Sequence, residues 1–80
     1  MRKFLIVVDM QKDFVNGALG TPEAVAIVPR VAEKIRSFPG ELFVTLDTHE
    51  TDYLQTAEGK KLPIPHCIRN TAGWQLDQSV

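Results

Sequence analysis

The feature that most constrains the fold is a run of five apolar residues, 4–8 (FLIVV), that leads straight into polar side chains. Three of the five are β-branched, and an unbroken run of this kind is typical of a strand covered on both faces in a parallel sheet. Asp9 follows the run directly. Because open parallel α/β sheets bind ligands at the carboxyl ends of their strands, Asp9 is a candidate for chemistry, with a turn-capping role as the alternative.

A helix and a second strand are expected next. Residues 15–20 carry turn signals, and residues 21–23 (TPE) have the pattern of a helix start with Thr as N-cap. Because Pro29 would break a helix begun there, we expect a short turn first and the main helix from about Pro29 to the Pro-Gly pair at 39–40. Residues 42–46 (LFVTL) are typical of a second strand. The apolar residues of the helix share one face: Val28, Val31, Ala32 and Ile35.

A strand, a helix and a strand in this order predict a right-handed βαβ unit with two parallel strands. The carboxyl ends of both strands then lie side by side. Asp9 follows the first strand and residues 47–49 (DTH) follow the second, so these distant segments are expected to meet at one edge of the sheet.

The histidines suggest a metal site. Asp47 and His49 form a D-x-H pair, whose side chains point to one side of an extended segment. A polar loop over residues 50–62 is expected to follow, and the stiff residues 63–65 (PIP) then present His66. One carboxylate and two imidazoles suit Zn, Fe or Mn. The alternative is a capped turn and a surface imidazole, because short motifs of this kind discriminate loosely.

Cys67 stands next to His66, an arrangement that suggests a Cys-His nucleophile pair. Neighbouring residues of an extended segment point in opposite directions, so the two side chains are not expected to touch. A small buried packing residue is the better interpretation of Cys67. Residues 72–76 are expected to begin a short helix, with Trp74 and Leu76 packed inward.

Composition excludes several classes of partner. The chain has 80 residues, a net charge of -1 and no basic stripe, so neither nucleic acid nor an anionic membrane is an expected partner. Its longest apolar run is far below the roughly 20 residues that cross a bilayer. A single cysteine excludes an internal disulfide, and the N-terminus lacks the pattern of a signal peptide, so we expect a cytoplasmic location.

Four motifs occur in a fixed order: DMQKDF after the first strand, LDTH after the second, then PIPHCI and NTAGW. Through them nearly the whole chain resembles the amino-terminal half of the isochorismatase-like cysteine hydrolases, most of all the nicotinamidase (pyrazinamidase) branch. The resemblance implies a three-layer, Rossmann-like α/β fold with a mostly parallel sheet. Residues 1–80 would be the amino-terminal part of a single domain and would supply its first βαβ portion.

The resemblance also implies an activity, the hydrolysis of a small amide such as nicotinamide to its acid and ammonia. Asp9 matches the family's catalytic aspartate, and Phe14 matches an aromatic residue that lines the substrate pocket. Gln11 and Asp13 are expected to organise the loop that follows the first strand. The metal ligands of the nicotinamidase branch, which hold zinc, iron or manganese, are matched by Asp47, His49 and His66.

The family's lysine and nucleophilic cysteine are expected beyond Val80, and Cys67 matches a non-catalytic position. Pro63 stands where several nicotinamidases have an aromatic residue, which leaves the substrate open. Two parallel strands are not normally stable alone, so more chain or a partner is expected. Two alternatives follow: a binding or assembly module without catalysis, and an isochorismatase-branch hydrolase of other specificity. A small amide is the expected ligand, and relatives suggest a homo-oligomer.

Overall fold

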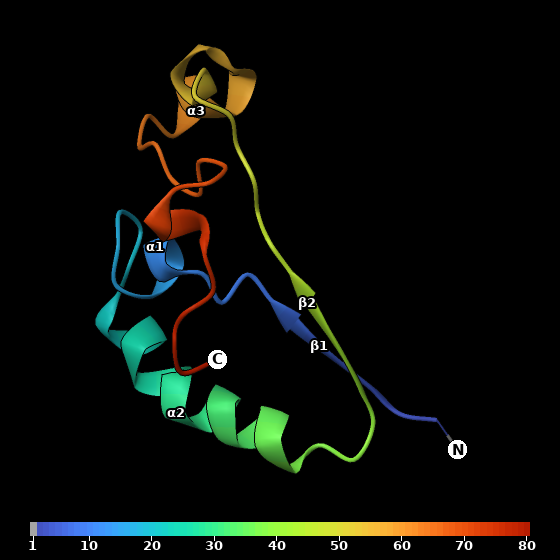
Figure 1. The fold of residues 1–80 in the computed structure, drawn as a ribbon. Coiled ribbons are helices and arrows are strands. Elements are labelled where there is room, and N and C mark those ends of the chain that lie inside the picture. Colours follow the sequence, from blue (N-terminus) through green and yellow to red (C-terminus); the bar gives the residue numbers. More distant parts are fainter. Residues whose placement is uncertain (1) are drawn as a thin grey trace.

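The two apolar runs form a parallel pair of strands. In the computed structural model, which describes residues 2–80, β1 spans Phe4–Val8 and β2 spans Glu41–Thr45. Phe4 lies opposite Glu41, and Val8 lies opposite Thr45. The predicted βαβ unit is therefore confirmed, with both strands ending at the same edge (Figure 1).

The intervening helix, α2, spans Pro22–Ser37, and Pro29 lies inside it. Thr21 is the N-cap as predicted, and its hydroxyl accepts a hydrogen bond from the Ala24 N–H at 3.0 Å. The expectation of a separate turn before Pro29 was wrong. Pro29 removes the N–H that would bind the Val25 carbonyl, but both residues are exposed, so water can bind that oxygen. Burial of Val28 and Ala32 along the same helix favours one continuous helix.

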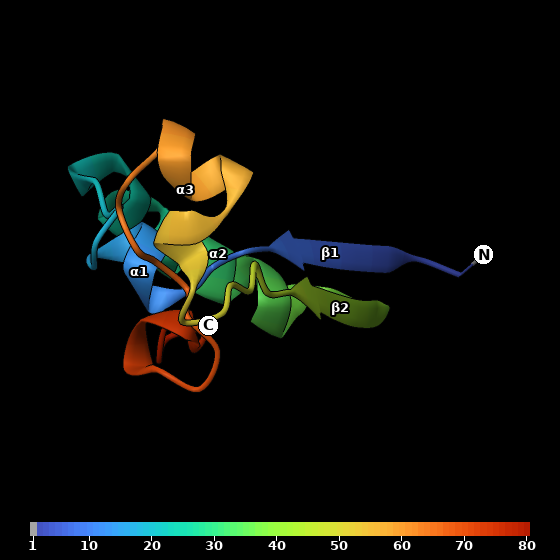
Figure 2. The same cartoon turned by 90° about the horizontal axis from the view of Figure 1, so that it is seen from above.

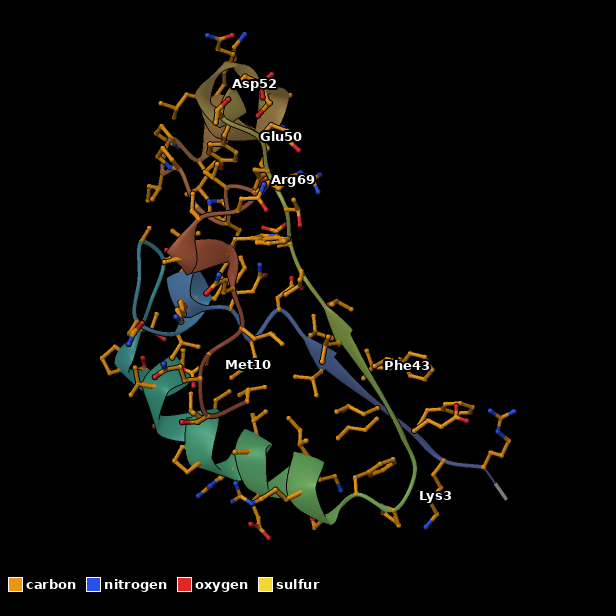
Figure 3. All side chains as sticks on the ribbon, viewed as in Figure 1. Lys3, Met10, Phe43, Glu50, Asp52 and Arg69 are labelled. Atoms are coloured by element: carbon orange, nitrogen blue, oxygen red, sulfur yellow. The ribbon has the colours of Figure 1, made fainter. Side chains whose placement is uncertain are left out.

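Within the described residues the sheet is covered on only one face, so these residues alone do not provide the predicted burial of both faces. Val7 of β1 is buried. A groove lies between β1 and α2, lined mainly by apolar residues and, on the α2 side, also by Arg30 and Lys34. Phe4, Ile6 and Val8 alternate with Val7 and are 52%, 61% and 63% exposed. Figure 3 shows Phe43 on the side of β2 away from α2, where its ring contacts Phe4. Only α2 lies over the strands, while the other helical segments lie beyond their carboxyl ends (Figure 2).

Besides α2, the described residues form four short helical segments. They are α1 (Lys12–Val15), η1 (Tyr53–Gln55), α3 (Ala57–Lys61) and η2 (Ala72–Trp74). Two of them, η1 and α3, form within the polar segment 50–62 that was expected to be a loop. Tertiary contacts stabilise these short elements, since the Lys12 N–H donates to the Gln75 carbonyl at 2.9 Å. The expected short helix at 72–76 is a single 3₁₀ turn, with Trp74 and Leu76 half-buried.

No helix within residues 2–80 combines the length and the apolar character that crossing a lipid bilayer requires.

Candidate metal centre

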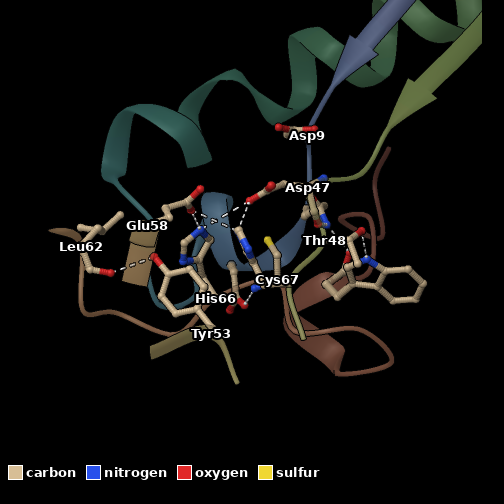
Figure 4. Close-up of polar contacts among 12 residues, drawn as sticks. Asp9, Asp47, Thr48, Tyr53, Glu58, Leu62, His66 and Cys67 are labelled. Atoms are coloured by element: carbon tan, nitrogen blue, oxygen red, sulfur yellow. Dashed lines mark hydrogen bonds and ion pairs between the residues drawn. The ribbon is translucent and has the colours of Figure 1, made fainter. Parts of the chain in front are cut away.

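Asp9 leaves β1 in a strained backbone conformation, with a φ of 53°. Its N–H donates to the carbonyl and the hydroxyl of Thr45, the last residue of β2, at 3.2 and 3.1 Å. The same hydroxyl donates to Asp9 Oδ1 at 2.7 Å. These bonds tie the two strand ends together and hold the Asp9 carboxylate at the edge where Asp47 also emerges (Figure 4). A non-glycine residue at positive φ is often found at a functional site.

The three predicted metal ligands converge. Asp47 Oδ2 lies 3.0 Å from His49 Nε2 and 3.4 Å from His66 Nε2. One ligand atom from each residue can be chosen so that all lie within 4.8 Å of one another. The structure therefore brings together the D-x-H pair and a histidine from a different loop, as the sequence predicts.

Main-chain contacts hold both histidines in place. His66 is 3% exposed, and its Nδ1 lies 2.8 Å from the Ile64 carbonyl, which can only accept a hydrogen bond. Nδ1 therefore donates to that carbonyl, and Nε2 is the ring nitrogen that faces the cluster and could bind a metal. The His49 N–H donates to the Cys67 carbonyl at 2.9 Å, which docks the two ligand loops on each other.

Glu58 on α3 is a fourth ionisable side chain at the cluster. Its Oε2 lies 3.3 Å from His49 Nε2 and 4.0 Å from His66 Nε2. Sequence reasoning missed it because residues 50–62 have no clear period. The available signal was Thr56 followed by Glu58, an N-cap with an acid in the first turn. The Thr56 hydroxyl does accept the Gly59 N–H, at 3.0 Å.

Tyr53, which sequence reasoning also missed, forms one wall of the cluster. It is 1% exposed, and its ring meets the His49 and His66 rings edge-on at centroid distances of 4.7 and 5.1 Å. Burial raises the pKa of its phenol, and the charges of Glu58 and Asp47 raise it further. The neutral hydroxyl donates to the Leu62 carbonyl at 2.8 Å.

Phe14 and Cys67 lie beside the cluster in different settings. The half-buried Phe14 ring lies edge-on to His66 at 5.5 Å. Cys67 is fully buried, and burial, with smaller effects from Asp47, Asp13 and Asp9, raises the pKa of its thiol to about 12. A thiol that stays protonated and has no access to solvent is a packing residue, as predicted for Cys67.

The residues present fit a divalent transition metal. A carboxylate oxygen and two imidazole nitrogens face one another, and the Glu58 carboxylate is close enough to join them. Zinc takes three or four ligands of these types, and iron and manganese accept the same set.

Similarity to known proteins agrees with this geometry. The family model of the Isochorismatase domain matches residues 3–80. A pyrazinamidase of Pyrococcus horikoshii, solved in complex with zinc, is 38% identical with a TM-score of 0.75, over 96% of this chain and 48% of that one.

N-carbamoylsarcosine amidase from Thermoplasma acidophilum is 24% identical with a TM-score of 0.79, over 99% of this chain and 45% of that one, and supports the fold alone. The chain thus spans about half the length of these relatives. No curated protein matches it. The family match over residues 3–80 and the shared α/β fold show that this chain belongs to the isochorismatase family.

Proposed function

We propose that the protein carrying this chain hydrolyses a small amide, nicotinamide or a close analogue, at a metal-assisted site of the nicotinamidase type. The observation that carries the proposal is the Asp47, His49 and His66 cluster at the same sheet edge as Asp9. Support comes from the similarity to a pyrazinamidase that binds zinc. The retained D-x-H pair and His66 argue against the isochorismatase branch, which generally lacks these ligands.

In this proposal Asp9 is the general base. Its Oδ1 is oriented by the Thr45 hydroxyl at 2.7 Å, and the second carboxylate oxygen is available to accept a proton from a nucleophile. Phe14 lines the pocket in which an aromatic substrate ring is held. A metal ion bound by the cluster would act as a Lewis acid toward a ring nitrogen of the substrate and so orient its amide.

The lysine and the nucleophilic cysteine of such a site would come from protein outside residues 1–80. Cys67 is not the nucleophile, because its thiol is fully buried and the pKa of that thiol is raised to about 12. We further propose that residues 1–80 are the amino-terminal part of a single hydrolase domain. In that arrangement further chain would cover the exposed sheet face around Ile6 and Phe43.

An assembly module is the second candidate function, and the same exposed face favours it. Phe4, Ile6 and Val8 present a row of apolar side chains that a partner subunit could bury. This reading requires a stable heteromer and no thiol-dependent turnover in the purified protein. A full-length protein that releases ammonia from nicotinamide would rule it out.

The test of the proposed function is Asp9→Asn in the full-length protein, with ammonia release from nicotinamide as the assay. Loss of a general base is expected to lower kcat by about 10²- to 10⁴-fold. Asp52→Asn is the matched control, because Asp52 is exposed and its side chain caps nothing. Unchanged hydrolysis in the Asp9 variant would show that Asp9 is not the base.

A further inference from the structure

Gln11 is a fully buried polar residue between β1 and α1, and its side chain binds the main chain of a metal-site residue. Its Oε1 accepts a hydrogen bond from the Asp47 N–H at 2.9 Å, and its Nε2 donates to the Asp47 carbonyl at 2.9 Å. The second Nε2 proton goes to the Trp74 carbonyl at 2.7 Å. Both donors of the amide are therefore used inside the protein.

The two bonds to Asp47 restrain that residue on both sides of its Cα. Rotation about φ moves Cα relative to the peptide group that carries the N–H, and rotation about ψ moves it relative to the peptide group that carries the carbonyl. A side-chain amide that binds both the N–H and the carbonyl therefore resists either rotation. With both peptide groups held, the Cα–Cβ bond of Asp47 has a fixed direction, and the carboxylate can be turned only about χ1 and χ2. Asp47 is also the residue whose Oδ2 contacts both histidines, at 3.0 and 3.4 Å.

We propose that Gln11 is a positioning residue that aims the Asp47 carboxylate at a bound divalent metal. The inference rests on the proposed metal site but concerns a residue that donates no ligand atom. Without the Gln11 amide, the Asp47 N–H and carbonyl lose this partner, and the peptide groups on either side of Asp47 are less restrained. Metal affinity then falls because the carboxylate is no longer held toward the two imidazoles.

Thr48 provides a matched control. Its hydroxyl accepts the indole N–H of Trp74 at 2.8 Å, so it ties together the same two segments that Gln11 joins. The same hydroxyl donates to the Leu46 carbonyl at 3.1 Å, and it binds neither the N–H nor the carbonyl of Asp47, the two groups that Gln11 holds. Thr48→Val removes both bonds of this hydroxyl at almost constant volume and keeps the two bonds between Gln11 and Asp47, so it tests whether joining the segments is sufficient.

The experiment measures Zn²⁺ binding to the full-length protein by competition with a chromophoric chelator, together with the visible spectrum of the Co²⁺-loaded protein. The variants are Gln11→Ala, Gln11→Met and Thr48→Val, each checked by circular dichroism. Gln11→Met keeps most of the side-chain volume and removes the hydrogen bonds, so it stays informative if Gln11→Ala does not fold. We expect Zn²⁺ affinity about 10- to 100-fold lower and a changed Co²⁺ spectrum for Gln11→Met, and near wild-type values for Thr48→Val.

Wild-type Zn²⁺ affinity in a folded Gln11→Met variant would overturn the inference. An equal loss of Zn²⁺ affinity in Thr48→Val would also overturn it, because the effect would then come from joining the Asp47 and Trp74 segments and not from holding the main chain of Asp47. A wild-type protein without stoichiometric Zn²⁺ would also overturn it. The metal is measured without substrate, so a protein that binds Zn²⁺ tightly but cleaves no amide would reject the proposed function and leave the role of Gln11 standing.

Discussion

Gly73→Ala is expected to break the contact that holds the His66 loop against α1. A Cβ built on Gly73 would lie 2.2 to 2.3 Å from three atoms of the Asp13 carboxylate, so that carboxylate must move. Its Oδ2 accepts the N–H of Cys67 at 2.8 Å, and Cys67 is fully buried. The carboxylate is the end of a side chain that can rotate, so the cost is the lost hydrogen bond rather than a clash with the backbone.

Leaving a buried N–H without its partner costs about 1 to 3 kcal/mol. We therefore expect Gly73→Ala to lower the free energy of unfolding of the full-length protein by about that amount in urea denaturation. Asp13→Ala removes the same hydrogen bond and should cost a similar amount. Because both substitutions break one contact, the double variant should be little worse than Asp13→Ala alone, which gives a coupling energy of about 1 kcal/mol or more.

Strict additivity of the two substitutions would refute this reasoning, as would a Gly73→Ala variant as stable as the wild type. Additivity would mean that Gly73 and Asp13 act through separate contacts. The unfolding m-values of all four proteins should agree, since a change in m would signal a different denatured or native ensemble.

Two further predictions concern the cluster and its surroundings. His49→Ala combined with His66→Ala should abolish stoichiometric metal, measured by atomic absorption, whereas unchanged metal content would reject the site. Cys67 has a folded pKa of about 12, against an ordinary value of 9.0, so the folded state holds the thiol proton more tightly than the unfolded chain does. This contribution to stability is complete below pH 9.0 and is lost as the pH rises toward 12. The free energy of unfolding should therefore fall with rising pH in this window, and less steeply in Cys67→Ala; equal slopes would contradict the assigned cause.

Local patterns were sufficient to predict the elements on which the site stands. Residues 4–8 are apolar and β-branched, and residues 42–46 repeat the pattern after a helix, which dictates parallel strands with adjacent carboxyl ends. The same logic placed Asp9 near the D-x-H pair. The period of two along an extended segment is a local property, so it could be applied without knowing the fold.

Pro29 and the polar segment 50–62 show where local rules fail. A proline disfavours a helix by local geometry, but burial of Val28 and Ala32 in α2 outweighs that cost. Residues 50–62 lack a period because η1 and α3 are each only one turn long, too short to display one.

The sequence by itself determined the strand–helix–strand order of β1, α2 and β2, the parallel strand ends and the residue types of the cluster, because each depends on neighbours close along the chain. Only the tertiary structure decided that Glu58 and Tyr53 join His49 and His66, and that Gln11 holds Asp47. These contacts join residues far apart in sequence or on segments without a pattern. Their geometry depends on how the loops pack at the end of the sheet, and no local signal encodes that packing.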